Sequence, residues 1–581
     1  MAHELSRNGS GRGPLLPGLA VLRRYERPWL RGDVLGGVTV AAYLVPQVMA
    51  YAAVAGLDPV VGLWASVGPL LVYTFLGSSR RLSVGPESTT ALMTAAAVGA
   101  MTAGDPDRYA SAAAALALVV GVVCLFGRVL RLGFLADLLS RPVLVGYLAG
   151  IAVLMVVSQL GKLTGMDVQG DTPLEETTYV LTHLDGVQLP TLVLALGVTA
   201  GLLIAQRVRP TWPNPLIAML LAALVVWAAD LEEQGLATVG SIPRGLPVPG
   251  LPDVELAVVL ELLLPAVGVA VVGYSDNVLT ARAFAARHHE RVDADQELLA
   301  LGAANVAAGL THGFPVSSSG SRTVIGDSLG VRTQLHSVVA VVTVLVGMLA
   351  LGPVLAAFPL AALGGVVTYA AIRLVDVEEI RRIAHFRSSE LVVTVATTVG
   401  VLLLGVLPGI GVAIALSILE LLRRVARGHD GILGSPPGVP GMHDVDDYPD
   451  AVQVEGLVVY RYDSPLFFAN AEDFRHRALT AVEEADQPVA WLLLNMEANV
   501  EVDLTALDAL EDLRGTLADR GVLVTLARVK QDLREDLDAF GLTDRIGPEH
   551  VYPTMPTAVT SYVRDFTARH GRPPLGAPTP L

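Results

Sequence analysis

Runs of apolar residues separated by short polar stretches make up most of the chain. They lie near residues 34–54, 59–77, 87–101, 110–127, 141–160, 190–206, 214–229, 260–284, 296–310, 321–330, 336–352, 359–374, 390–406 and 408–422. An α-helix needs about 20 mainly apolar residues to cross the hydrocarbon core of a bilayer, and several of these runs are shorter. The pattern predicts a polytopic α-helical membrane protein with about fourteen spanning or half-spanning segments.

Two polar interruptions, 83–89 and 315–323, stand inside this apolar pattern. The run that follows each is too short for a full crossing, so the third and tenth segments are predicted to be broken helices. Broken backbone survives at membrane depth only where protein or a watery cavity satisfies its N–H and C=O groups. A half-helix points its positive N-terminal end into that cavity, which suits an anion. The pair predicts the substrate site of an anion transporter.

The two halves of the chain are spaced as duplicated halves are. Pro46-Gln47 precedes the first interruption and Asp276-Asn277 precedes the second, and corresponding positions are offset by roughly 230 residues. Seven segments per half is an odd number, which forces the halves into opposite orientations. We therefore expect a seven-plus-seven inverted repeat with the two half-helix N-termini facing each other.

The positions of arginine predict which loops face the cytoplasm. With the N-terminus inside, alternation places the arginine-rich loops on the inner side, among them 128–141, 282–291, 381–387 and 423–427. The loop 163–189, assigned outside, contains acidic residues and neither lysine nor arginine. We expect a multi-pass protein of the cell's inner membrane, with both termini in the cytoplasm.

Composition agrees with this class and excludes others. Of 581 residues, 52% are hydrophobic and only 17% are charged, whereas soluble chains carry about 25% charge. The net charge of −16 leaves no basic surface on which nucleic acid could bind. The single cysteine, Cys124, cannot form an internal disulfide.

The end of the chain has a different pattern, typical of a soluble α/β domain. Strand-like runs at 456–462, 489–494 and 521–527 alternate with helical patterns, and prolines in 431–441 predict a linker before them. We expect a cytoplasmic N-terminal segment at 1–32, a transmembrane domain at 33–427, a linker at 428–447, the α/β domain at 448–570 and a tail at 571–581.

Asp276 is an ionisable residue inside an apolar run. An ionised carboxylate at the bilayer centre costs about 2.5–3.5 kcal/mol, so it must face the bundle interior, a cation or a proton. Thr280 lies one helical turn further on the same face and can address the same ligand. The pair predicts a site for a coupling ion, Na⁺ or H⁺; the alternative is a structural tie of Asp276 to Arg322 or to backbone.

Arg322 stands beside Ser321 at the start of the second half-helix. Two half-helix ends carry the equivalent of about +0.5 charge each, and Arg322 adds to them, which predicts an anion pocket opposed by Asp276. The expected substrate-binding residues are Gln47, Tyr51, Gly85, Glu87, Ser88, Ser321 and Arg322. Alternatives remain a structural or gating role for Arg322 and helix–helix hydrogen bonding for Gln47. We find no nucleophile–base set and no cluster of metal ligands, so we expect neither an enzyme nor a cofactor.

Several ordered motifs resemble those of the sulfate permease family of anion transporters. They are Pro46–Ala52, Gly56-Leu57-x-Pro59, Ser83–Pro86, Asp276-x-x-Leu279-Thr280, Glu297-Leu298 with Gly302 and Asn305, and Ser321-Arg322-Thr323 with Arg332-Thr333-Gln334. The resemblance runs nearly end to end and is greatest to actinobacterial members regarded as sulfate transporters. It implies a uracil-permease-like core, dimerisation and elevator-type alternating access, and it favours sulfate as the substrate.

Two positions depart from the family pattern. Many members have glutamate where this chain has Asp276, a position linked to proton coupling, whereas Asp276 with Thr280 resembles sodium-coupled bicarbonate members. Glu87 follows Gly85-Pro86 where some relatives have an aromatic ring. Bicarbonate or dicarboxylate transport, an anion channel and a signalling scaffold therefore remain alternatives to sulfate symport.

The final domain resembles the STAS domain, named after sulfate transporters and anti-sigma-factor antagonists. Asp503-Leu504-Thr505-Ala506 matches the loop in which antagonist proteins carry a phosphorylatable Ser or Thr, and a helix N-terminus suits a phosphate. The resemblance implies a regulatory site at Asp503 and Thr505 and a cytosolic partner there. The alternative is that one of the two merely caps the helix.

Overall fold

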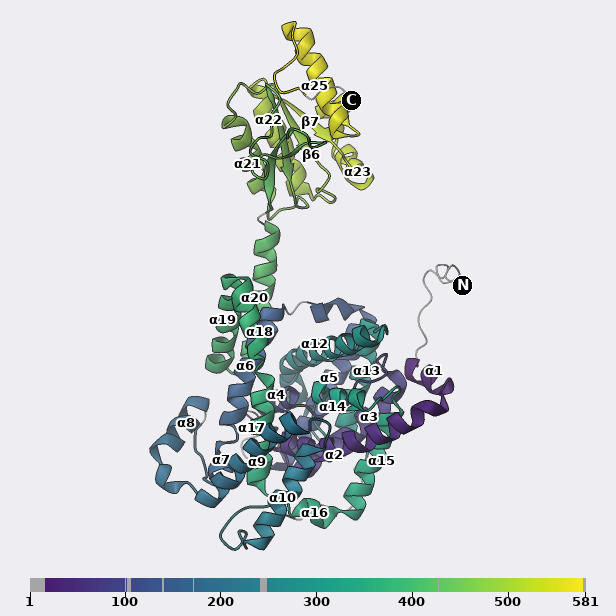
Figure 1. Ribbon diagram of the computed structural model, residues 1–581, viewed down its shortest axis with the longest axis vertical. Helices are drawn as coiled ribbons and strands as arrows, with labels where there is room; N and C mark the ends of the chain where they lie inside the picture. Colours follow the sequence, from purple (N-terminus) through teal and green to yellow (C-terminus); the bar gives the residue numbers. More distant parts are fainter. Residues whose placement is uncertain are drawn as a thin grey trace. The chain divides into compact units, whose positions relative to one another are not determined.

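The structure is a computed structural model that describes residues 16–99, 101, 106–137, 140–170, 172–240, 248–426 and 428–577. It divides into two compact units, Met1–Ser417 and Ile418–Leu581. The first is helical and the second contains a β-sheet covered by helices (Figure 1). Arg427, which the arginine pattern assigned to the inner side, lies outside the described residues, as do residues 1–15 and the last four residues of the tail.

Each of the apolar runs corresponds to a helix of the structure. These helices are α2 (Leu30–Val54), α3 (Pro59–Leu76), α4 (Ser88–Val98), α5 (Pro106–Val129), α6 (Arg141–Val157), α9 (Leu189–Val208), α10 (Asn214–Ala228), α12 (Leu263–His288), α13 (Ala294–Leu310), α14 (Gly320–Ser328), α15 (Leu335–Ala350), α17 (Leu360–Leu374), α19 (Ser388–Leu404) and α20 (Val406–Ala426). Shorter helices connect them, namely α1 (Pro17–Arg23), α7 (Leu160–Thr164), α8 (Pro173–Thr182), α11 (Leu256–Glu261), α16 (Gly352–Ala356) and α18 (Val377–Phe386). In the described chain, 6 helical stretches are long and apolar enough to cross a membrane, so the number of crossings stays a prediction.

The two polar interruptions become the broken third and tenth helices that the sequence predicts. α4 has 11 residues and α14 has 9, and at about 1.5 Å per residue neither spans a bilayer. The strands before them, β1 (Val84–Gly85) and β2 (Ser317–Ser318), pair antiparallel, with Val84 opposite Ser318 and Gly85 opposite Ser317. The two half-helices therefore begin side by side at one crossing point.

Helix packing reproduces the expected exchange between halves. α2 packs on α15, while α12, which corresponds to α2, packs on α5, which corresponds to α15. α3 packs on its counterpart α13. Figure 1 shows α2 (purple) beside α15 (teal). Such swapped pairs are what two inverted repeats produce when they interlock.

Glycine permits the close contact between α5 and α13. A Cβ on Gly121 would lie 2.8 Å from the carbonyl oxygen of Gly302, and a Cβ on Gly302 would lie 3.0 Å from that of Gly121. Both approaches are too short for a larger side chain without movement of the backbone. Small residues at helix contacts are the usual way in which membrane helices gain van der Waals packing.

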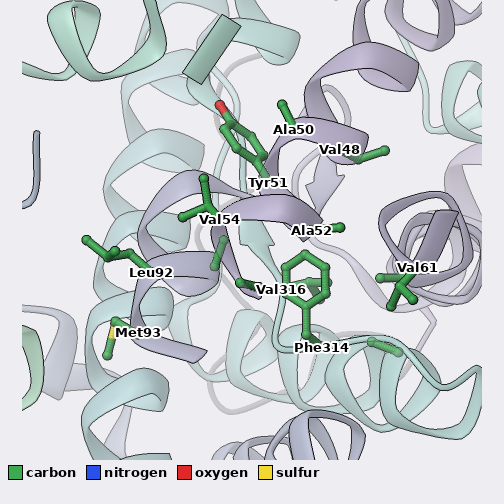
Figure 2. Close-up of a cluster of buried hydrophobic side chains, with 14 of the residues drawn as sticks. Val48, Ala50, Tyr51, Ala52, Val54, Val61, Leu92, Met93, Phe314 and Val316 are labelled. Atoms are coloured by element: carbon green, nitrogen blue, oxygen red, sulfur yellow. The ribbon is translucent and has the colours of Figure 1, made fainter. Parts of the chain in front are cut away.

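An apolar cluster holds the crossing point in place. Figure 2 shows its side chains, which come from α2, α3, α4 and the segment before β2 and include Val48, Val54, Val61, Leu92, Met93, Phe314 and Val316. Tyr51 belongs to the same region, but its hydroxyl points away from Phe314 (Figure 2). The half-helices thus rest on a tightly packed base that fixes the direction of their N-terminal ends.

The second unit contains a six-stranded sheet of order β4-β3-β5-β6-β7-β8. Its strands are β3 (Asp430–Gly434), β4 (His443–Asp444), β5 (Leu457–Tyr462), β6 (Trp491–Asn495), β7 (Leu523–Ala527) and β8 (Val551–Tyr552). The strands β5 to β8 run parallel, and β3 is antiparallel to β5. The helices are α21 (Ala471–Glu483), α22 (Leu504–Asp519), α23 (Gln531–Phe540), α24 (Leu542–Ile546) and α25 (Met555–His570).

Alternate residues of the strands face two separate cores. Val458 and Tyr460 of β5 pack with α21 and α22, whereas Leu457 and Val459 pack with α25. This alternation is the period of two that a strand imposes on its side chains. The three predicted strands are confirmed as β5, β6 and β7, and helical patterns between and after them are confirmed as α21, α22, α23 and α25.

The prediction that 428–447 is a linker outside the α/β domain is wrong, because this segment contains two strands of the sheet. Asp430–Gly434 and His443–Asp444 are strands β3 and β4, and β3 pairs with both β4 and β5. The prolines that suggested a linker lie between the two strands, where the chain turns. The segment is the edge of the sheet.

Candidate anion site

Hydrogen bonds join the two interruptions beyond the β1–β2 pair. The backbone N–H of Ser319 donates to the carbonyl oxygen of Ser83 at 2.9 Å. In the other direction, the N–H of Ser83 donates to Oγ1 of Thr323 at 3.1 Å. The half-helix N-termini are therefore held together by backbone as well as by side chains, as the inverted repeat predicts.

Arg322 is fully buried at the start of α14 and lies at the centre of this crossing. Its Nε donates to Ser83 Oγ at 3.3 Å, and its Nη1 donates to Gln47 Oε1 at 3.2 Å and to the carbonyl oxygen of Pro86 at 3.0 Å. All three acceptors are neutral. None of these three hydrogen bonds is therefore part of an ion pair.

One nitrogen of this guanidinium has an unused donor. Within the described part of the chain, Nη2 of Arg322 is buried and has no hydrogen-bond partner. A Cβ on Gly85 would lie 3.4 Å from Nη2, so the absence of a side chain at Gly85 leaves space beside it. A buried unmade bond to a charged donor is costly, and a ligand that accepts it recovers that cost.

Gln47 links α2 to this arginine. Its Oε1 accepts from Arg322, and its Nε2 donates to the hydroxyl oxygen of Tyr51 at 3.0 Å. Pro46 lies inside α2 just before it and removes one helical N–H donor. The Gln47 amide therefore makes a hydrogen bond between helices, which was the alternative to substrate binding, and its partners Arg322 and Tyr51 are themselves predicted substrate-binding residues.

Glu87 is the N-cap residue of α4. Its Oε2 accepts from the backbone N–H of Thr89 at 2.7 Å, and its Oε1 accepts from the hydroxyl of Ser88. The N-terminus of α14 is different, because its N-cap residue Ser319 makes no side-chain capping bond. A carboxylate of the protein therefore already occupies one of the two half-helix ends.

Asp276 lies on the other side of the crossing, on α12. Its Oδ2 accepts from the hydroxyl of Ser318 in β2 at 3.0 Å. Thr280 follows one turn later on the same helix and lines the same cavity. Since the bonds of Arg322 go to Ser83, Gln47 and Pro86, the structure does not support a direct tie between Asp276 and Arg322.

A cavity of about 550 Å³ opens between these elements. Of the predicted site residues, its lining includes Gln47, Tyr51, Glu87, Ser88, Asp276, Thr280 and Ser321. Gly85 and Arg322 are not part of this lining, but Arg322 donates to Gln47 of the lining, and a Cβ on Gly85 would lie 3.4 Å from Nη2 of Arg322. The structure therefore brings every predicted substrate and coupling residue of the membrane unit to one place.

Sequence reasoning missed further lining residues. Tyr43 lies one helical turn before Gln47 on α2, so the four-residue spacing that paired Gln47 with Tyr51 could have found it. Tyr369 and Arg373 approach from α17. They follow neither interruption, and nothing in the local pattern distinguishes them from residues of an ordinary helix end.

Glu297, a residue of the motifs that resemble the family, lies on α13 and binds α12 through Asn277. It is fully buried on α13 and accepts hydrogen bonds from the hydroxyl of Tyr73 at 2.9 Å and from Nδ2 of Asn277 at 2.6 Å. It also accepts from the backbone N–H and hydroxyl of Ser78. Because Asn277 is next to Asp276, this network fixes the direction in which Asp276 projects.

The loop of the second unit that we predicted to be regulatory lies at the start of α22. Asp503 caps this helix by accepting from the N–H of Ala506 at 2.8 Å, and it also accepts from the N–H of Phe468 at 2.7 Å. Asp503 therefore caps the helix, as the alternative to a regulatory role expected. Thr505 is exposed in the first turn, and its phosphorylation stays a prediction.

Comparison with protein families gives two matches in the order of the two units. Residues 30–397 match the Sulfate permease family. Residues 448–558 match the STAS domain. Together the matched ranges include every predicted site residue.

Individual relatives agree with the family match. The chain is 57% identical over 548 residues to a protein of Mycobacterium tuberculosis named "Probable sulfate transporter", and the alignment covers 94% of this chain and 98% of that protein. It is 27% identical over 564 residues to "High affinity sulfate transporter 1" of Stylosanthes hamata, with 93% and 85% covered.

Solved structures show the same fold. Murine Solute Carrier 26 family member A9, an anion transporter, matches with a TM-score of 0.86 and 23% identity over 96% of each chain. The transmembrane domain of the cyanobacterial bicarbonate transporter BicA matches with a TM-score of 0.60 and 22% identity, over 66% of this chain and 98% of that domain.

Proposed function

Because the chain belongs to the sulfate permease family, we propose that it is a secondary active transporter that takes up sulfate in symport with H⁺ or Na⁺. One observation carries this proposal. The N-termini of the two half-helices converge beside one cavity, and the N-terminus of α14 has no side-chain cap. The fully buried Arg322 lies there too and has, among the described residues, an N–H donor without a partner. That combination is a site for an oxyanion.

The charges of the site support a small, doubly charged oxyanion. Two half-helix ends contribute about +0.5 each, and Arg322 contributes a full positive charge. The planar guanidinium matches the oxygen spacing of a tetrahedral oxyanion better than an ammonium group does. We infer that the anion accepts hydrogen bonds from Nη2 of Arg322 and from the first N–H groups of α14, with Ser321, Gln47 and Tyr51 at its sides.

Coupling is proposed to take place at Asp276 and Thr280. Both side chains offer oxygen atoms to the cavity, and the carboxylate accepts a hydrogen bond from the neutral hydroxyl of Ser318. A sodium ion held by these oxygens, or a proton on Asp276, removes the negative charge that opposes the substrate. Anion and cation then enter together because each makes the site favourable for the other.

We propose an elevator-type movement for the transport step. In this scheme α2–α5 with α12–α15 form the moving core that carries the crossing point, and α6, α9, α10, α17, α19 and α20 form the gate. Tyr369 and Arg373 of α17 reach the cavity from the gate. Sliding the core past α17 would carry the bound anion from one side of the membrane to the other.

The remaining expectations belong to this proposal. We place the protein in the cell's inner membrane with both termini in the cytoplasm, as a homodimer, with a regulatory partner at the Asp503–Thr505 loop of the STAS domain. We propose no enzymatic reaction, no cofactor beyond the coupling cation and no nucleic-acid partner.

Bicarbonate or a dicarboxylate is the second candidate substrate, favoured by the pairing of Asp276 with Thr280 in one cavity. A channel is a different class; single-channel currents through the purified protein would overturn the carrier proposal. A purely signalling scaffold would lose its role on deletion of the STAS domain while transport stayed intact.

Substrate binding can be tested on the purified full-length protein. We expect sulfate to raise its melting temperature at constant ionic strength, because a ligand that binds only the folded state stabilises it. Chloride at the same ionic strength is the control. Equal melting temperatures in the two salts, together with a rise in bicarbonate, would transfer the proposal to the second candidate.

A further inference from the structure

The two half-helices differ in what occupies their N-terminal ends. At α4, the carboxylate of Glu87 accepts the N–H of Thr89 at 2.7 Å and the hydroxyl of Ser88. At α14, the N-cap residue Ser319 makes no side-chain capping bond. Glu87 also lines the cavity. An anion that used both half-helix ends would therefore have to replace this carboxylate at α4.

Among the residues that the structure describes, Glu87 forms no ion pair. Its bonds come from a backbone N–H and a hydroxyl, both neutral, and the bonds of Arg322 likewise go to neutral oxygens. Among the described residues, Tyr51 of α2, Tyr147 of α6, Asp276 of α12 and Arg322 of α14 are ionisable groups that interact with it electrostatically.

The other helices place few further ionisable groups near Glu87. α5 also packs on α4, but its first ionisable residues follow the C-terminal end of α4, about 15 Å of helix away from Glu87. Across the cavity, α17 contributes Arg373. The site therefore contains two carboxylates that each have only neutral hydrogen-bond partners, on α4 and on α12.

We propose that Glu87 is an internal competitor of the transported anion and carries a coupling proton, an inference that rests on the proposed function. When Glu87 is deprotonated, its carboxylate occupies the end of α4. A proton taken up from water forms an O–H bond on this carboxylate, which removes the negative charge and frees the N–H of Thr89 for an oxygen of the anion. When the anion leaves, the proton returns to water and the carboxylate binds the N–H of Thr89 again.

This role is separate from that of Asp276. Asp276 is bound by Ser318 of β2 and can hold the coupling cation or a second proton there, while Glu87 acts at α4. With both carboxylates charged, the two half-helix ends and Arg322 are balanced to a net charge of about zero. A dianion therefore binds well only after both carboxylates are neutralised, which predicts two positive charges moved with each sulfate.

The test measures sulfate binding to the purified full-length protein between pH 5.5 and pH 8, a range in which sulfate stays a dianion. For the unmodified protein we expect the affinity to fall as pH rises, by up to about tenfold per pH unit for each coupled proton. Glu87→Gln keeps an oxygen that can accept the N–H of Thr89 but carries no charge. We expect it to bind sulfate at pH 8 at least about tenfold more tightly than the unmodified protein. Its plot of log affinity against pH should be shallower by the contribution of one proton.

Two further variants make the result decisive. Glu87→Ser also gives a neutral N-cap, and serine is a favoured residue there, so it replaces Glu87→Gln if that variant does not fold. Glu232→Gln removes an exposed carboxylate after α10 and should retain the unmodified pH profile.

The outcomes separate this inference from the proposed function. If folded Glu87→Gln and Glu87→Ser keep the full pH slope, or bind no sulfate at any pH, the role of Glu87 is overturned while sulfate transport stands. If the unmodified protein binds no sulfate across the range, both proposals are contradicted.

Discussion

At the scale of single residues, the site is organised around a buried charge that is not fully satisfied. Arg322 uses Nε and Nη1 to hold Ser83, Gln47 and Pro86 but leaves Nη2 without a partner among the described residues. A buried unsatisfied donor costs about 1–3 kcal/mol, and more when it is charged. The same residue therefore joins the two interruptions and, in the proposed site, is the charged donor that would bind the anion.

Substitution of Arg322 separates these two duties. Arg322→Lys keeps the charge but loses the planar fork, so we expect sulfate uptake in proteoliposomes to fall by about tenfold. Arg322→Ala loses charge and fork together and should lower uptake by about 100-fold. Uptake by Arg322→Ala at the level of the unmodified protein would show that the anion binds elsewhere.

The part of the site that could be predicted from the sequence was the single charged residues within apolar runs. Asp276 and Arg322 stand out because an ionisable residue at membrane depth needs a partner. Tyr369 and Arg373 were not predictable, because α17 reaches the cavity only through the packing of the whole unit. The capping position of Glu87 was also hidden, since it depends on where α4 begins.

At the scale of elements, short strands decide where the half-helices start. The two residues of β1 and the two of β2 fix the register of 83–89 against 315–323. Close helix contacts such as that of α5 with α13 then hold the halves together. Element positions in the membrane unit were predictable because apolar runs are long, whereas β3 and β4 were missed because short strands around a proline-rich turn resemble a linker.

The contact between α5 and α13 gives an element-scale prediction. A Cβ added by Gly121→Ala would lie 2.8 Å from the carbonyl oxygen of Gly302, so we expect a loss of about 1–3 kcal/mol of stability and a lower melting temperature in detergent. Gly201→Ala is the matched control, because nothing lies within 4 Å of its added Cβ on α9. Equal melting temperatures for the two variants would contradict this view of the packing.

At the scale of the whole molecule, the chain joins a membrane unit, in which we propose the anion site, to a STAS domain. The predicted site residues for substrate and coupling all lie in the first unit, and Asp503 and Thr505 lie in the second. Transport chemistry and regulation should therefore be separable by mutation.

Thr505→Asp tests this division. A negative charge in the first turn of α22 imitates phosphate and is favoured by the helix N-terminus, so the domain should stay folded. We expect the rate of sulfate uptake to change while the ratio of sulfate to bicarbonate uptake stays that of the unmodified protein. An altered ratio would show that the STAS domain takes part in substrate selection.

The most direct measurement is uptake of labelled sulfate and labelled bicarbonate by proteoliposomes, with sodium and pH gradients imposed separately. We predict that sulfate accumulates when a sodium or pH gradient is directed inward, and that Asp276→Asn lowers this dependence by one coupled cation and leaves only the proton assigned to Glu87. Accumulation of bicarbonate alone would contradict the assignment of sulfate. Gradient-dependent uptake that Asp276→Asn leaves unchanged would contradict the coupling of anion and cation in one cavity.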